Sequence, residues 1–135
     1  MNLETTSLAR QVDFVFRQLE GELKSATAGT IMIHVRNNSV GKYGIRHNPI
    51  ECKNGEIEQA GGGMTAQQVQ ALRQMAIDAL KLKANWTHGE IMYDFSVRPS
   101  TGSWSASIMY ESNYNTANWN YRYQPKHPSL GYVSE

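Results

Sequence analysis

The sequence predicts one α+β domain, with a mostly antiparallel sheet of five or six strands and two helices packed on one face. Three observations lead to this prediction. The chain has 135 residues, which is the length of one domain. Two segments repeat apolar residues with helical spacing, and several shorter segments alternate apolar and polar residues as strands do. The elements follow the order α-β-β-β-α-β-β-(β), which is typical of an α+β fold.

The first helix is expected over residues 8–23. A hydroxyl side chain from Thr5, Thr6 or Ser7 can cap its start, and Ala28-Gly29 lies beyond its end. Its apolar positions follow the spacing of a single helical stripe, which predicts one buried face. The stripe consists of Leu8, Val12, Val15, Phe16, Leu19 and Leu23.

Strands are expected next over residues 30–35 and 40–47. The Asn-Asn-Ser sequence at 37–39 supplies the turn between them. Residues 50–59 are expected to form a short third strand that bends at Asn54-Gly55, a pair that suits a tight hairpin turn.

The second helix begins at Thr65, which acts as its N-cap. Gln68, three residues later, completes a capping-box pattern, and the helix is expected to end near residues 83–85. Residues 91–98 and 104–111 then alternate as two strands of a hairpin with one aromatic and aliphatic face toward the core. The residues expected to point inward include Tyr93, Phe95, Trp104 and Tyr110.

A last edge strand is expected over residues 119–123, where Trp119, Tyr121 and Tyr123 alternate with polar residues. Proline residues follow at once and stop the strand. We therefore expect residues 1–124 to form the single domain and residues 125–135 to form a C-terminal tail.

Composition excludes several classes of protein. The net charge of +1 argues against a dedicated nucleic-acid or membrane-surface protein, because both need a basic excess on one face. The single cysteine, Cys52, excludes an internal disulfide and a zinc site built on cysteines, and it fits a reducing compartment. Residues 1–10 have neither the basic nor the apolar region of a secretory signal, so none is expected there. No apolar run reaches the roughly 20 residues of a membrane span. A cytoplasmic protein is expected.

Residues that could carry catalysis are sparse. The four histidines lack the local spacing of a metal site, so neither a metal ion nor another cofactor is expected. A pocket between helices and sheet, near His47, Cys52 and His88, would suit a small enzyme or a ligand-binding domain. Because no family-specific signature surrounds Cys52, we favour a protein without enzymatic activity.

Aromatic residues gather in the last fifty residues, whereas charged residues become rare there. Residues 110–123 consist largely of Tyr, Trp, Asn and Ser, a mixture that protein-recognition surfaces favour. The outward face of the hairpin adds acidic side chains that suit a basic partner. The residues expected to bind a protein partner are Asp94, Glu111, Tyr114, Trp119, Tyr121, Arg122 and Tyr123.

Two other uses of the aromatic segment stay open. Stacked Tyr and Trp rings also bind single-stranded nucleic acid, but only Arg122 and Lys126 are basic nearby, and an electrostatic groove needs more. An exposed edge strand over residues 119–123 could also pair with a second copy and form a homodimer.

Four short motifs resemble those of the YezG-like immunity proteins of bacterial polymorphic toxin systems. They are Leu72-Arg73, Trp86-Thr87, Gly102-Ser103-Trp104 and Tyr110-Glu111, and the likeness covers about residues 69–111. The resemblance implies a cytoplasmic protein without enzymatic activity. It would bind and block the toxic C-terminal domain of a cognate effector, often a nuclease, by occluding it or by mimicking an anionic substrate.

Overall fold

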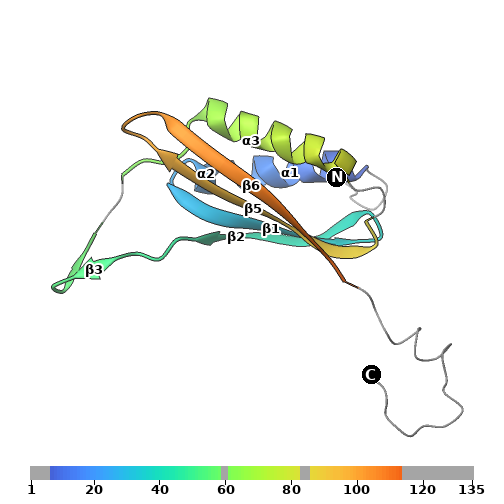
Figure 1. Ribbon diagram of the computed structural model, residues 1–135, viewed down its shortest axis with the longest axis horizontal. Helices are drawn as coiled ribbons and strands as arrows, with labels where there is room; N and C mark the ends of the chain where they lie inside the picture. Colours follow the sequence, from blue (N-terminus) through green and yellow to red (C-terminus); the bar gives the residue numbers. More distant parts are fainter. Residues whose placement is uncertain (1–6, 59–60, 83–85, 114–135) are drawn as a thin grey trace, which may run out of the picture.

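The computed structural model describes residues 7–58, 61–82 and 86–113, and within them it confirms the predicted α+β class. Four antiparallel strands form the main sheet: β1 (Ala28–Arg36), β2 (Ser39–His47), β5 (His88–Arg98) and β6 (Ser103–Ser112), in the order β2-β1-β5-β6 (Figure 1). The expected last strand over residues 119–123 and the tail over residues 125–135 lie outside the described residues.

The first helix is divided in two. Helix α1 (Leu8–Gln18) begins at Ser7, whose side chain accepts a hydrogen bond from the backbone N–H of Arg10. At Leu19 the backbone turns to φ −92° and ψ 1°, and the short helix α2 (Glu20–Leu23) follows. The predicted stripe is nevertheless continuous, because both Leu19 and Leu23 are buried with the α1 residues.

Helix α3 (Ala66–Ala79) has the predicted capping box. The backbone N–H of Gln68 donates to the Thr65 hydroxyl at 3.1 Å, and the backbone N–H of Thr65 donates to the Gln68 side chain at 2.9 Å. The helix tightens into a 3₁₀ turn, η2 (Leu80–Leu82). Its predicted end near residues 83–85 falls outside the described residues.

Residues 50–59 do not form the single bent strand that the sequence suggests. Strands β3 (Cys52–Lys53) and β4 (Glu56–Ile57) form a separate hairpin that extends away from the main sheet (Figure 1). The Asn-Gly turn is confirmed, with φ of 53° at Asn54 and 78° at Gly55, as a type I′ turn requires. This segment contains many charged residues and few apolar ones, so it has no apolar face to bury against the helices.

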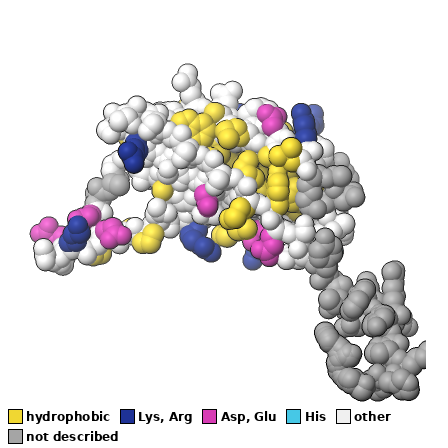
Figure 2. All heavy atoms as spheres, viewed as in Figure 1, with side chains coloured by type: hydrophobic (Ala, Val, Ile, Leu, Met, Phe, Trp, Pro, Cys, Tyr) yellow, Lys and Arg dark blue, Asp and Glu magenta, His cyan; other side chains and the backbone are white. Residues whose placement is uncertain are grey.

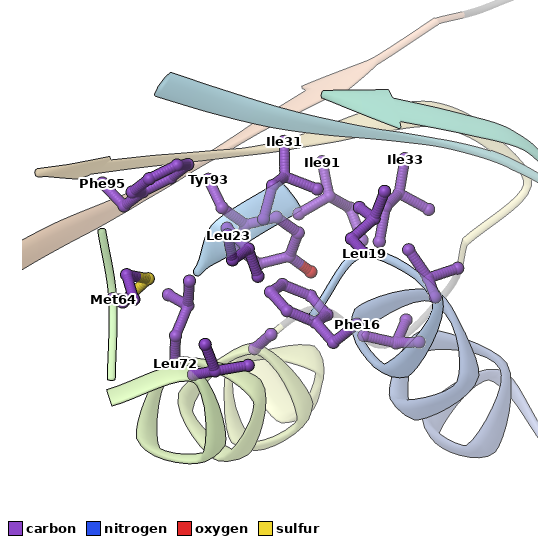
Figure 3. Packing of buried hydrophobic residues seen from close by; sticks show 14 of the residues in the cluster. Phe16, Leu19, Leu23, Ile31, Ile33, Met64, Leu72, Ile91, Tyr93 and Phe95 are labelled. Carbon is purple, nitrogen blue, oxygen red and sulfur yellow. The ribbon is translucent and has the colours of Figure 1, made fainter. Parts of the chain in front are cut away.

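Helices α1 and α3 cover one face of the main sheet, and the core lies between them and the strands (Figures 1 and 3). Phe16 of α1 meets the ring of Tyr93 of β5 edge to face, with centroids 5.2 Å apart and an interplanar angle of 79°. The predicted inward residues of the hairpin, Tyr93, Phe95, Trp104 and Tyr110, all pack on this side. The alternation of β5 and β6 is therefore confirmed.

Gln11 is a fully buried polar residue on the apolar side of α1. Its side-chain oxygen accepts a hydrogen bond of 2.7 Å from the backbone N–H of Val40, close to the point where the pairing of β1 and β2 shifts register. The bond joins the helix to the edge of the sheet and satisfies a backbone donor that is buried away from water.

Replacing Gln11 by alanine is expected to lower the free energy of unfolding by about 2 kcal/mol, because the N–H of Val40 would stay buried without its acceptor. Urea unfolding followed by circular dichroism measures the change. Gln18→Ala on the same helix is the matched control, since Gln18 is exposed, and it should cost less than about 0.5 kcal/mol. Equal losses in the two variants would contradict this role of Gln11.

Candidate functional site

The face of the main sheet that points away from α1 and α3 is left uncovered by the described helices, and we call it the open face (Figures 1 and 3). Residues that pair in an antiparallel ladder share one face, so the register determines which side chains lie side by side. Three rows cross the middle of the open face from β2 to β6: Arg46–Thr30–Asp94–Ser107, Gly44–Met32–Met92–Met109 and Lys42–His34–Glu90–Glu111.

The middle row is apolar. Met32, Met92 and Met109 lie on three neighbouring strands, and Met109 is 52% exposed. Gly44 continues the row on β2 without a side chain. Methionine is unbranched and adapts its shape to its surroundings, so this methionine row can fit partner surfaces of different shapes.

The acidic residues of the open face lie on β5 and β6. The Thr30 hydroxyl donates to a carboxylate oxygen of Asp94 at 2.6 Å, which holds that carboxylate in place. Nε2 of His34 lies 2.7 Å from a carboxylate oxygen of Glu90, and Glu111 is the direct neighbour of Glu90 across the ladder. Among the described residues Glu111 has no hydrogen-bond or ion-pair partner, so its exposed carboxylate is available to a partner.

The basic residues of the same rows lie on β2. Lys42 and Arg46 are both exposed, and a guanidinium nitrogen of Arg46 approaches the sulfur of Met32 at 4.0 Å. Each charged row therefore runs from a basic end at β2 to an acidic end at β5 and β6. Within these three rows the charges are divided by sign, which favours one orientation of a docked protein over the reverse.

Two of the predicted binding residues lie on this face. Asp94 and Glu111 are exposed on β5 and β6, with Asp94 opposite Ser107 and Glu111 opposite Glu90. Asp94 stands four residues from Glu90 along β5, which is about 13 Å. The other five predicted residues, Tyr114, Trp119, Tyr121, Arg122 and Tyr123, lie outside the described residues.

Sequence reasoning missed the methionine row and the basic side chains on β2. Alternation alone places Met32, Met92 and Met109 outward on their strands. Their adjacency depends on β1 lying between β2 and β5, which the sequence pattern does not indicate. Gly41 and Gly44 weaken the alternation of β2, so the face occupied by its basic residues could not be assigned.

The three residues of the alternative pocket do not converge. His47 pairs with Gly29 near one end of β1, and His88 pairs with Arg36 at the other end, about 23 Å away along the strand. A groove of about 760 Å³ lies beside His47, which is 2.9 Å from a carboxylate oxygen of Glu22. Neither Cys52 nor His88 lines that groove, so the described residues do not form one pocket around all three side chains.

The motif residues of the immunity-protein resemblance mainly stabilise the fold. Leu72 is fully buried, and Nε of Arg73 on α3 lies 3.0 Å from a carboxylate oxygen of Asp13 on α1. Trp86 packs edge to face on Tyr110, whose hydroxyl donates to the carbonyl of Ala79 at 2.6 Å. These contacts join the two helices to each other and α3 to β6.

Within the described ranges, no three His, Cys, Asp or Glu side chains are grouped so that they could hold a metal ion. The helices of these ranges include none with both the length and the apolar character needed to cross a membrane.

Comparison of the chain with protein-family models, with curated proteins and with solved structures finds no match in any of the three.

Proposed function

We propose that this protein is an immunity protein, which binds the toxic C-terminal domain of a cognate bacterial effector in the cytoplasm and neutralises it. The observation that carries the proposal is the open face, where the methionine row, exposed at Met109, lies between two rows that carry charged side chains. The sequence motifs that resemble immunity proteins support the same conclusion.

The composition of the open face suits a protein partner. The methionine row provides apolar contact area that adapts to a partner and loses its water on binding. The charged side chains on either side of the row provide charge complementarity. Glu90, Asp94 and Glu111 gather on the β5 and β6 side. Nuclease domains bind the phosphate backbone with basic side chains, so an acidic surface of this kind can cover such a site and compete with nucleic acid.

The proposal is tested with the toxic domain of an effector that is encoded next to this gene. Co-expression of the full chain should restore growth of cells that produce the toxic domain, and the purified proteins should form a complex. Asp94→Lys and Glu111→Lys should each weaken affinity about 30-fold, the size expected of a hot-spot residue. The combined change Trp119→Ala and Tyr121→Ala tests the aromatic segment in the same assay.

Glu56→Lys is the matched control, because it makes the same change of charge at an exposed position on β4, in the separate hairpin. It should leave affinity unchanged. A toxic domain that does not bind the chain would refute the proposed function, and binding that is insensitive to Asp94→Lys and Glu111→Lys would refute the proposed surface.

A further inference from the structure

Among the described residues, strand β6 is an edge of the main sheet, and it lacks the usual protection against pairing. It runs for ten residues, contains no proline or lysine, and has Glu111 as its only charged residue. The opposite edge, β2, carries Lys42, Arg46 and two glycines, and its pairing with β1 is irregular. Of the two edges, β6 is thus the one suited to accept another strand.

One hydrogen bond identifies the backbone groups of β6 that point away from β5. The N–H of Asn113 donates to the carbonyl of His88 on β5, so odd-numbered residues of this regular ladder point their backbone groups toward β5. Even-numbered residues consequently direct N–H and C=O away from the sheet. The side chains of these even-numbered residues lie on the side of the sheet that the helices cover. Four of them pack against the core and are apolar or aromatic: Trp104, Ala106, Ile108 and Tyr110.

We propose that β6 pairs antiparallel with β6 of a second copy of this chain, about a two-fold axis at Ser107, to form one continuous eight-stranded sheet. In this register Trp104 lies opposite the partner's Tyr110, and Ala106 lies opposite the partner's Ile108. Each of these pairs joins two even-numbered residues, whose backbone N–H and C=O groups point away from β5. The two residues of a pair therefore exchange two backbone hydrogen bonds. The two copies of Ser107 face each other with small side chains at the axis.

Charge selects this register. Arg98 pairs with Ser103 on the open face, and Ser103 would lie opposite the partner's Glu111. The backbones of Arg98 and the partner's Glu111 are then two strand spacings apart, about 10 Å, and only a short serine separates their long side chains. Symmetry makes this contact twice, whereas the two copies of Glu111 stay about 26 Å apart.

Neighbouring registers lose the contact. An axis at Ile108 would place Glu111 opposite the partner's Ser105, whose own neighbour on β5 is Ser96 and not a cation. An axis at Ala106 would place Glu111 beyond the end of the partner's β6.

Helix α3 presents an apolar flank on the side that faces away from α1, toward the β6 edge of the sheet. Ala71, Met75 and Ala79 follow each other at intervals of four residues, on the side of the helix opposite Arg73, which contacts α1. Met75 is 41% exposed, and Figure 2 shows hydrophobic side chains between α3 and the edge of the sheet. The two-fold axis would bring the α3 helices of both copies together and cover this flank.

Analytical ultracentrifugation of the full chain tests the proposal without any toxin. The parent should sediment as a dimer with twice the mass of the 15.2 kDa chain. Arg98→Glu and Glu111→Arg should each raise the dissociation constant about tenfold, because each turns two attractive contacts into repulsive ones. Within one chain these residues lie at opposite ends of the hairpin, so they cannot compensate each other internally.

Mixing the two variants gives the decisive measurement. In a mixed dimer, the glutamate introduced by Arg98→Glu in one chain meets the arginine introduced by Glu111→Arg in the other. The second contact joins the unchanged Arg98 of one chain to the unchanged Glu111 of the other. Both contacts therefore join opposite charges, so an equimolar mixture of the two variants should associate with the affinity of the parent. The double variant, carrying both changes in one chain, should also recover the parent affinity.

A full chain that stays monomeric at about 100 μM would overturn the proposal and leave the β6 edge to a segment of the same chain or to another protein. A dimer whose affinity is unchanged by Arg98→Glu and Glu111→Arg would overturn it as well, because it would use a different surface. Neither result depends on the proposed function, since the measurement contains no toxin and Arg98 is not among the acidic residues proposed to bind it.

Discussion

Replacing Phe16 by alanine is expected to lower the free energy of unfolding by about 4 kcal/mol, the largest loss that we predict for a single change. Phe16 is fully buried on α1 and meets the ring of Tyr93 from the central strand β5. Its removal takes a large apolar surface out of the core and leaves a cavity between helix and sheet that close packing cannot fill. Urea unfolding followed by circular dichroism measures the loss.

Phe14→Ala is the matched control for this prediction, because the same side chain is removed from the same helix. Phe14 is only half-buried and does not belong to the core cluster. Its replacement should cost about 1 kcal/mol or less. An equal or larger loss at Phe14 would mean that α1 turns a different side toward the sheet, which would contradict the packing in Figure 3.

Tyr93 is expected to make the protein sensitive to alkali. Burial raises the pKa of its hydroxyl far above the ordinary value of 10, with a smaller contribution from Tyr110. Among the described residues the hydroxyl has no hydrogen-bond partner. Above pH 10 the unfolded chain loses this proton while the folded chain keeps it, so stability falls as the pH rises. The loss should reach about 2 kcal/mol between pH 10 and pH 12.

Tyr93→Phe should remove that part of the alkaline loss and should be at least as stable as the parent at pH 7, because it deletes a buried hydroxyl that makes no bond among the described residues. Free energies of unfolding measured from pH 7 to pH 12 test both statements. Tyr43→Phe, at a residue that is 37% exposed, is the control and should keep the loss seen in the parent. An unchanged pH profile for Tyr93→Phe would show that its hydroxyl is not shielded from water.

Local patterns were enough to predict most elements of the fold. Ser7 and the pair Thr65 and Gln68 cap their helices as expected, because capping depends on side chains within one turn. The Asn54-Gly55 turn is likewise a local property of the chain. The strand expected around this turn became a separate hairpin, since pairing with the main sheet depends on an apolar face that the segment lacks.

The candidate site was predicted only in part. Asp94 and Glu111 could be assigned to the outward face because alternation along a strand is a local rule. The burial of Gln11 could not be anticipated, since a lone polar residue beside an apolar stripe has no periodic signal. Its partner, Val40, is 29 residues away and meets it only after the helix has packed on the sheet.

The sequence by itself determined the kinds of element, their approximate bounds and which side chains of β5 and β6 face the helices, because periodicity and capping act over a few residues. Only the tertiary structure decided the strand order β2-β1-β5-β6. That order brings Met32 beside Met92, puts the bases of the charged rows on β2 and their acids on β5 and β6, and makes β6 an edge among the described strands. Contacts between distant strands depend on how the whole core packs, and no local pattern encodes them.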